Sequence, residues 1–307
     1  MASGSGIKHK MSAAVSPTER GDVITSRENK WIKLFRAALR GTGPSGDGLI
    51  GIEGPKLVEE ALRSGLEADA LLVSATGEQH LPQILMAASA SDAGIRRERI
   101  FKTTDQLFAG CAGTETPQGV AALFHQPQWN PEDVLRGRPA ADGARSAEEP
   151  LVLVMTGVQD PGNVGTILRS AEAFGATGAV MTRGTADPWS PKAVRASAGS
   201  ALRLPLMRGM AIPVLLAQLK MHEVQIVAAS LHAGTNHSQR DRDALTVLRG
   251  PAAIFIGSEG TGLPPEIEHA ADATISIPMS ESVESLNAAI AASVLLYEAA
   301  RQRKEIS

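Results

Sequence analysis

The sequence has very little of the chemistry that builds disulfide or metal scaffolds. Its 307 residues include one cysteine, Cys111, so no disulfide can form within the chain. No cluster of cysteine and histidine has the spacing of zinc ligands, and we expect no metal site. A chain with a single cysteine is typical of a reducing compartment, which predicts a cytoplasmic protein.

The chain also lacks a segment that could enter a membrane. Its longest apolar stretch, residues 288–296, is too short to span a bilayer. The first twenty residues are small and polar and match neither a signal peptide nor an anchor. We interpret residues 1–21 as a disordered tail. The remainder is a folded protein, because 43% hydrophobic residues suffice to form apolar cores.

Aromatic residues are scarce, at 3% of the chain, which leaves few rings for stacking on nucleic-acid bases. The net charge of −3 hides an asymmetry, because the first forty residues carry eight basic and three acidic side chains. A basic arm attracts a phosphate backbone. Basic helix faces are common, however, so on charge alone a solvated face is the better interpretation.

The first half of the chain predicts a small α/β unit. Apolar periodicity indicates helices over residues 27–40, 55–64, 80–91 and 105–108. Between them lie strand patterns at residues 49–52, 70–73, 100–101 and 120–124. Residues 126–149 are rich in proline and charge and are typical of a linker. We therefore expect one domain at residues 22–125 and a second at 150–307.

The second half predicts a parallel sheet. Residues 151–155 form an uninterrupted apolar run, the pattern of a strand that is covered on both faces. Further strands are expected at residues 179–181, 225–229, 252–256 and 274–277. Helices are expected near residues 191–202, 213–222 and 264–271, with another after the first strand and a last one from 285 to about 303.

Three polar or glycine-bearing stretches follow predicted strands of this second half. They cover residues 163–169, 257–262 and 277–279, the last followed by 285–287. Because ligands bind at the carboxyl ends of parallel strands, the three stretches predict one pocket.

Taken singly, several of these residues have structural explanations. Asn163 stands at or near a helix start, where asparagine is a good cap, and Arg169 could be an ordinary surface residue. Gly175 is best read as the glycine that ends that helix. Ser285 is fully explained as the cap of the last helix, whereas Asn287, in its first turn, suggests an amide with a partner in the pocket.

The glycine-rich stretch predicts the kind of ligand. Gly257, Gly260 and Gly262 permit close backbone approach to a flat or anionic molecule. The spacing matches neither the dinucleotide motif nor a P-loop. Glu259 repels phosphate but accepts hydrogen bonds from a hydroxyl, an amine or arginine. The loop therefore suits a ligand that contains a nucleoside and no polyphosphate.

These stretches together resemble the three motifs of the SpoU (TrmH-type) branch of the SPOUT RNA 2′-O-methyltransferases. The resemblance rests on residues 163–175, on residues 256–263, and on residues 277–279 with 285–289, in that order. Residues 22–125, with the segments 53–61 and 114–119, resemble the substrate-binding domain that is often fused ahead of the catalytic domain. The match covers nearly all of the folded chain. One such motif could agree by chance, but three motifs in the correct order are not expected by chance.

The resemblance implies a trefoil knot near the C-terminus and a homodimer in which the knot regions meet. The last helix, apolar around more than one face, fits packing against both its own sheet and a second subunit. S-adenosyl-L-methionine would contact Gly257, Ile277 and Leu286, largely through backbone groups. The family's catalytic and substrate-positioning residues correspond to five positions, namely Asn163, Arg169, Glu259, Ser285 and Asn287.

The implied reaction is methyl transfer from a sulfonium to a ribose 2′-oxygen, with Arg169 at the family's key position. A free guanidinium stays protonated, so it is implausible as a base. We expect Arg169 to orient the ribose or its phosphate and to stabilise negative charge, unless a bound RNA phosphate helps it lose a proton. Asn163 and Glu259 would orient Arg169 and the ribose. Ser285 and Asn287 would connect the last loop to both.

One position departs from the family pattern. Glu281 stands where a glycine is usual, and it cannot take glycine-only dihedral angles cheaply. The loop after residues 277–279 is therefore expected to follow a different path.

Three functions stay open at this point. The leading one is an RNA 2′-O-methyltransferase, and the separate N-terminal domain and basic arm favour ribosomal RNA over transfer RNA. The second is a non-catalytic RNA-binding homologue, which the intact Asn163, Arg169, Glu259 and Asn287 disfavour. The third is a nucleotide-dependent dehydrogenase or ligase, weakened by the missing phosphate-binding motifs.

Overall fold

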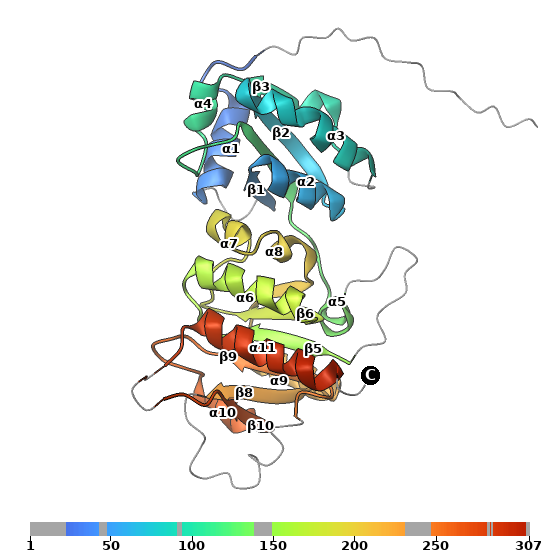
Figure 1. Ribbon diagram of the computed structural model, residues 1–307, viewed down its shortest axis with the longest axis vertical. Coiled ribbons are helices and arrows are strands. Elements are labelled where there is room, and N and C mark those ends of the chain that lie inside the picture. The colour runs from blue at the N-terminus through green and yellow to red at the C-terminus, as the bar shows by residue number, and fades with distance from the viewer. Residues whose placement is uncertain are drawn as a thin grey trace, which may run out of the picture.

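A computed structural model describes residues 23–42, 48–90, 94–137, 149–230, 247–280, 283 and 285–304. These residues form two α/β units that stand one above the other in Figure 1, joined by the segment that carries α5. The tail at residues 1–21 and Glu281 lie outside the described residues. None of the helices formed by the described residues is long and apolar enough to cross a bilayer.

The N-terminal unit is a mixed sheet with the strand order β1-β4-β2-β3. Strand β4 pairs antiparallel with β1 and β2, whereas β2 and β3 are parallel. Its strands are β1 (Leu49–Glu53), β2 (Ala68–Ser74), β3 (Ile100–Thr103) and β4 (Val120–His125). Its helices are α1 (Lys30–Arg40), α2 (Pro55–Arg63), η1 (Thr76–His80), α3 (Leu81–Ala90), η2 (Arg97–Arg99) and α4 (Asp105–Ala109).

The C-terminal unit is a six-stranded parallel sheet with the order β10-β8-β9-β5-β6-β7. Its strands are β5 (Leu151–Met155), β6 (Gly178–Thr182), β7 (Leu206–Met210), β8 (Gln225–Ser230), β9 (Ala252–Ile256) and β10 (Ala273–Ser276). Its helices are α6 (Pro161–Ala173), α7 (Pro191–Ala196), α8 (Ser200–Arg203), α9 (Ile212–Met221), α10 (Pro265–Ala270) and α11 (Ala288–Lys304).

Helices cover both faces of the C-terminal sheet, as the uninterrupted apolar run of β5 predicts. Residues of α6 and α11 belong to one hydrophobic cluster with the sheet, and residues of α9 and α10 belong to another on the opposite side. Every residue of β5, β6 and β9 is buried. The α/β class and the parallel sheet predicted from the sequence are therefore confirmed. The trefoil knot implied by the resemblance stays a prediction.

Two details of the C-terminal unit differ from the prediction. The single helix expected near residues 191–202 is two short helices, because Ala198 and Gly199 take φ angles of 47° and 84° between them. Strand β7 was not predicted. It is an edge strand whose Arg208 and Gly209 are exposed, so its sequence lacks the apolar run of the central strands.

Helix α5 (Pro131–Arg136) lies within the expected linker, residues 126–149. Asn130 caps it in a reciprocal capping box with Asp133, and Pro131 opens its first turn. Its buried Val134 and Leu135 belong to the cluster that covers the far face of the C-terminal sheet. This part of the connection therefore packs on the second unit, and the domain limits themselves stay a prediction.

Arg203 of α8 joins the two units. Its Nε and Nη2 donate to the carboxylate of Glu172 on α6, each at 2.6 Å, and its Nη1 donates to Glu60 on α2. The hydrophobic cluster under α6 and α11 also continues into the face of the N-terminal sheet that α2 covers. The two units are thus connected by an ionic link and by shared apolar packing.

Candidate active site

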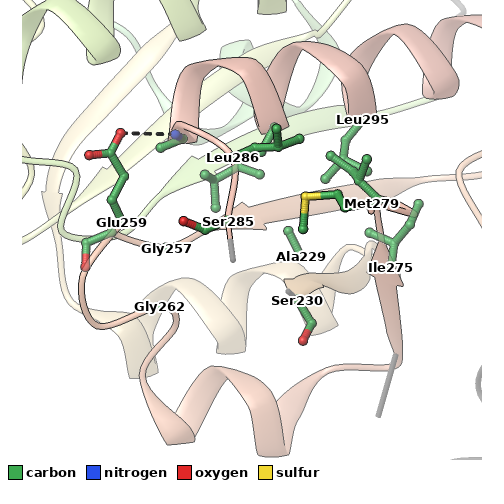
Figure 2. Close-up of a pocket in the computed structure, with 15 residues that line it drawn as sticks. Ala229, Ser230, Gly257, Glu259, Gly262, Ile275, Met279, Ser285, Leu286 and Leu295 are labelled. Atoms are coloured by element: carbon green, nitrogen blue, oxygen red, sulfur yellow. Dashed lines mark hydrogen bonds between the residues drawn. The ribbon is translucent and has the colours of Figure 1, made fainter. Parts of the chain in front are cut away.

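The loop after β9 carries Glu259, whose carboxylate joins three segments that are distant in sequence. Its Oε1 accepts hydrogen bonds from Nδ2 of Asn163 at 3.0 Å and from Nδ2 of Asn287 at 2.7 Å. It also accepts one from the backbone N–H of Ala288, the first residue of α11, at 3.2 Å (Figure 2). The three stretches predicted to form one pocket therefore meet at this carboxylate.

Asn287 is the cap of α11. Its Oδ1 accepts hydrogen bonds from the backbone N–H groups of Ala289 at 2.9 Å and Ile290 at 3.4 Å. The prediction that Ser285 caps this helix is wrong, since the helix starts at Ala288. Because its Oδ1 faces the helix, the amide nitrogen of Asn287 points to Glu259, so one side chain both starts the helix and binds the pocket loop.

Asn163 was interpreted from the sequence as a possible cap of α6, but another residue caps this helix. Asp160 caps α6 and accepts from the N–H of Gly162 at 3.0 Å, while Asn163 is already inside the first turn. Lys192 lies 2.6 Å from the same carboxylate. The hydrogen bonds from Lys192 and Gly162 hold the pKa of Asp160 below its ordinary value. The amide of Asn163 is therefore not engaged in capping and bonds Glu259.

A pocket of about 630 Å³ lies beside Glu259, at the carboxyl ends of β8, β9 and β10. The three expected cofactor contacts, Gly257, Ile277 and Leu286, all line it. Figure 2 shows the polar Glu259 and Ser285 toward one end and Ile275, Met279 and Leu295 at the other. The remaining lining residues are Ala229, Ser230, Ile256, Ser258, Gly262, Ala288 and Ala291.

The glycine at position 257 serves the loop itself. A Cβ there would lie 2.3 Å from the carbonyl carbon of Gly262, because the loop folds back on its own start. The N–H of Gly262 donates to the carbonyl of Ser258 at 3.0 Å and closes this turn. Gly262 has a φ of 66° and open space around its Cα. Compact folding of the loop, rather than ligand approach alone, therefore requires Gly257.

Arg169 stands apart from this pocket. It lies on the exposed side of α6, about 9 Å along the helix axis from Asn163, and it is absent from the pocket lining. Within the described ranges its side chain makes no hydrogen bond or ion pair, so the expected contacts with Asn163 and Glu259 are not present. Within those ranges, too, no group of three or more His, Cys, Asp or Glu side chains could hold a metal ion.

Comparison with known proteins gives this geometry a context. Residues 150–297 match the model of the SpoU rRNA Methylase family, and residues 45–122 match that of the MRM3-like substrate binding domain. The chain is 31% identical over 246 residues to the 23S rRNA (guanosine(2553)-2′-O)-methyltransferase RlmP of Bacillus subtilis, covering 80% of this chain and 86% of the relative. It belongs to the SpoU family.

Further similarities extend over the whole SpoU architecture. An uncharacterized tRNA/rRNA methyltransferase of Synechocystis is 33% identical over 283 residues, which cover 91% of this chain and 94% of the relative. The crystal structure of an AdoMet-bound rRNA methyltransferase from Sinorhizobium meliloti is 28% identical with a TM-score of 0.72, covering 91% of this chain and 97% of that one. Both units of the SpoU protein are therefore matched together.

Sequence reasoning missed part of the pocket wall in this SpoU protein. Ala229 and Ser230 line the pocket from the end of β8, and Met279 and Leu295 line its apolar side. The rule that ligands bind at the carboxyl ends of parallel strands pointed to β8 as well, because residues 225–229 were predicted as a strand. Leu295 carried no separate signal, since a core helix and a pocket wall need the same apolar residue.

Proposed function

We propose that this chain transfers a methyl group from S-adenosyl-L-methionine to a ribose 2′-oxygen of RNA, and that ribosomal RNA is its substrate. The observation that carries the proposal is the meeting of Asn163, Glu259 and Asn287 at the mouth of a pocket suited to a nucleoside. Three loops that are far apart in sequence supply these side chains. Their convergence is the geometry of a binding and reaction site at the carboxyl edge of a parallel sheet.

The lining of the pocket fits S-adenosyl-L-methionine. Its lining is mostly apolar with a few polar groups, as is usual for small-molecule sites. Ile275, Met279 and Leu295 offer an apolar wall for a flat base, and the loops after β9 and β10 offer backbone groups. The sequence contains neither the dinucleotide-binding motif nor a P-loop motif, in keeping with a cofactor that lacks a polyphosphate. Gly257, Ile277 and Leu286 would hold the cofactor.

When bound, the cofactor supplies a methyl group activated on a sulfonium. The chain's own residues must orient the ribose hydroxyl and stabilise the charge that develops on its oxygen. Glu259 anchors the side chains of Asn163 and Asn287 and the first turn of α11, so these groups form one rigid rim. Ser285 lines the pocket beside this rim. We assign Asn163, Glu259, Ser285 and Asn287 to positioning the ribose against the cofactor.

Arg169 has the free guanidinium that the substrate would engage. The side chain is exposed and makes no hydrogen bond or ion pair with another described residue, so no such bond must break before it meets RNA. A guanidinium binds phosphate bidentately and stays charged at neutral pH. We assign Arg169 to holding the ribose or its phosphate and to stabilising negative charge in the transition state.

The choice of ribosomal RNA rests on the N-terminal unit. Its match to a substrate-binding domain, and the link from Arg203 to Glu60 that connects it to the catalytic unit, support an extended, structured RNA as ligand. The relatives named above are, by name, an enzyme of 23S rRNA and an uncharacterized tRNA/rRNA methyltransferase. The cytoplasmic location expected from the single cysteine stays a prediction.

A homodimer through α6 and α11 is part of the proposal. Ile290, Val294 and Tyr297 recur at helical spacing on α11 and are 53%, 40% and 56% exposed. Tyr297 packs on Phe174, the residue that caps the C-terminus of α6, with ring centroids 5.8 Å apart, which extends the apolar surface toward the neighbouring helix. We expect the same face of a second subunit to cover this patch, because two-fold interfaces bury the same patch on both subunits. Arg169 lies on the solvent side of α6 and would then stand near the partner.

The test is methyl transfer to RNA. Purified protein should transfer labelled methyl from S-adenosyl-L-methionine to in vitro transcripts that tile the ribosomal RNA, and mapping of methylated riboses should locate the site. Arg169→Ala should abolish turnover while calorimetry shows unchanged cofactor binding. Lys220→Ala is the matched control, since it removes an exposed charge from α9. Activity of Arg169→Ala within a few-fold of wild type would remove Arg169 from the mechanism.

The dimer has its own measurement. Sedimentation velocity of wild-type protein should give a dimer, and Val294→Glu should shift it to a monomer because a charge in a buried apolar patch is costly. Met221→Glu serves as control, since Met221 is equally apolar and 79% exposed on α9. A wild-type monomer at micromolar concentration would contradict the dimer and leave the cofactor assignment standing.

A further inference from the structure

A second hollow lies on the carboxyl edge of the C-terminal sheet. It occupies about 690 Å³ at the ends of β6 and β7 and shares no lining residue with the pocket beside Glu259. Strand β5 separates the two, in the order β9-β5-β6-β7. Its lining residues are Met181, Thr182, Arg183, Gly184, Thr185, Ala186, Asp187, Pro188, Arg208 and Gly209. Nothing in the reaction described so far uses this hollow.

One arginine in the hollow is held in a fixed orientation. The guanidinium carbon of Arg208 lies 4.9 Å from the ring centroid of Trp189, a cation–π arrangement. Its Nη1 lies 3.3 Å from a carboxylate oxygen of Asp187, and its Nη2 donates to Oε1 of Gln126 at 3.0 Å. Trp189 is itself buried and donates from Nε1 to the carbonyl of Ala201 at 3.1 Å. The exposed Arg208 therefore presents a rigid, planar cation.

The other arginine in the hollow has no such restraint. The side chain of Arg183 is exposed and makes no hydrogen bond or ion pair with another described residue. Asp187, the one acidic residue in the lining, is engaged with Arg208. The hollow thus combines a fixed planar cation with a free one, which favours an anion that carries a flat group. A nucleotide has both parts.

The hollow is tied to the proposed methyl-transfer site through one loop. The N–H of Gly157 donates to the hydroxyl of Thr185 at 3.0 Å, and the N–H of Ala186 donates to the carbonyl of Val158 at 2.9 Å. The loop that contains Gly157 and Val158 leads directly to α6 and Asn163. An RNA strand with its target ribose at Asn163 would place neighbouring nucleotides along this edge.

We propose that the hollow binds a nucleotide of the RNA substrate that flanks the methylated one. Arg183 contacts its phosphate, and the guanidinium of Arg208, supported by Trp189, stacks on its base. The proposal rests on the RNA methyltransferase function proposed above. It adds a second point of contact on the same edge, which selects single-stranded or unstacked RNA around the target.

The experiment measures RNA and cofactor separately. Arg183→Ala should raise KM for the tiled ribosomal RNA transcripts about tenfold and leave the Kd of S-adenosyl-L-methionine unchanged. Plots of the logarithm of the RNA binding constant against that of salt concentration should lose about 0.7 to 0.9 in slope, the share of one phosphate contact. Lys220→Ala, which removes an equal charge from the exposed surface of α9, should change neither.

Arg208→Lys separates stacking from charge. It keeps the cation but loses the planar group, so KM for RNA should rise while the salt slope stays that of wild type. Arg183→Ala that matches Lys220→Ala in both KM and salt slope would overturn the proposal. The side chain of Arg183 has no described hydrogen bond or ion pair whose loss could act on folding, and alanine keeps the backbone hydrogen bond to Met210. Failure of the wild-type protein to methylate any transcript would count against the proposed function instead.

Discussion

The two units use the same alternation of strands and helices, yet only one of them gathers its polar loops in one place. All six strands of the C-terminal sheet are parallel, so the loops after β5, β6, β7, β8, β9 and β10 emerge at one edge. In the N-terminal sheet β4 runs antiparallel to β1 and β2, which divides the loops between two edges. Strand direction therefore decides which unit can build a pocket from several loops.

Both units nevertheless contain a carboxylate that collects loop donors. In the N-terminal unit Glu53 accepts from the N–H of Gly113 at 2.8 Å and from the hydroxyl of Thr114. Asp105 accepts from Ser74 and from the N–H of Thr76, and these bonds lower its pKa. The pocket beside Glu259 is lined by the C-terminal unit alone. A carboxylate among loop donors is thus a structural device, and the adjoining pocket makes Glu259 a candidate for function.

The largest effect should come from Gly257→Ala. The new Cβ would meet the backbone of Gly262 at 2.3 Å, so the loop after β9 must refold and its pocket wall is lost. Calorimetry should show no binding of S-adenosyl-L-methionine at concentrations that saturate the wild type. Gly77→Ala is the matched control in the other unit, because its Cβ would lie 2.0 Å from the carbonyl oxygen of Gly119.

The control distinguishes damage to the fold from damage to the pocket. Gly77→Ala should lower the Tm and leave cofactor affinity within about twofold of wild type. Position 77 is distant from the cofactor pocket, and distant sites usually respond independently to substitution. Equal loss of cofactor binding in both variants would contradict the assignment of the cofactor pocket to the C-terminal unit alone.

The next effect is that of Glu259→Ala. It removes the acceptor shared by Asn163, Asn287 and the N–H of Ala288. We expect kcat/KM for RNA to fall about 100-fold, because misplacing the reacting groups by about 1 Å has an effect of this size. Glu259→Gln should lose nearly as much if its amide cannot accept from both asparagines. Glu53→Gln, in the equivalent carboxylate cluster of the N-terminal unit, should keep wild-type kcat and change the Tm only. A kcat near wild type for Glu259→Ala would show that the contacts of Glu259 with Asn163 and Asn287 do not position the ribose.

The sequence predicted the sheet of the C-terminal unit better than the details of its site. Residues 151–155 and 252–256 were predicted as strands with the observed limits, because central parallel strands are continuous apolar runs. The start of α11 was predicted three residues early, since serine and asparagine are equally good caps and only the fold shows that Ser285 lines the pocket. Local preference cannot choose between two such residues.

Long-range contacts account for what the sequence did not reveal. The carboxylate of Glu259 lies 96 positions from Asn163 along the chain, and no local pattern predicts that their side chains meet. Strand β7 escaped prediction because an exposed edge strand has no apolar run. Positive φ at Ala198, which divides the helix expected near residues 191–202, is a conformation that alanine rarely adopts and that tertiary packing imposes.

A smaller effect is expected where the two units join. Arg203→Ala leaves the partly buried Glu172 without its partner and removes the bond to Glu60, so the free energy of unfolding should fall by about 1–3 kcal/mol. Because the bond to Glu60 crosses between the units, KM for RNA should rise while the Kd of the cofactor stays unchanged. Arg63→Ala, which removes the exposed partner of Glu59 on α2, is the control and should be nearly neutral. An unchanged melting curve for Arg203→Ala would show that shared apolar packing alone holds the units together.

The smallest effect is a dependence of this link on pH. Burial of the Glu172 carboxyl would raise its pKa, but hydrogen bonds from Arg203 and Ser200 and the charge of Arg203 outweigh burial and lower it. The folded protein therefore binds fewer protons than the unfolded chain, and the stability from this group is present above the unfolded pKa of about 4.3 and lost as pH falls through the folded value. Urea unfolding of wild type and Arg203→Ala should differ most near neutral pH and converge as pH falls below the unfolded pKa and through the folded one. A difference between the two proteins that stays constant over this range would mean that Arg203 stabilises the junction through its packing rather than through the charge of Glu172.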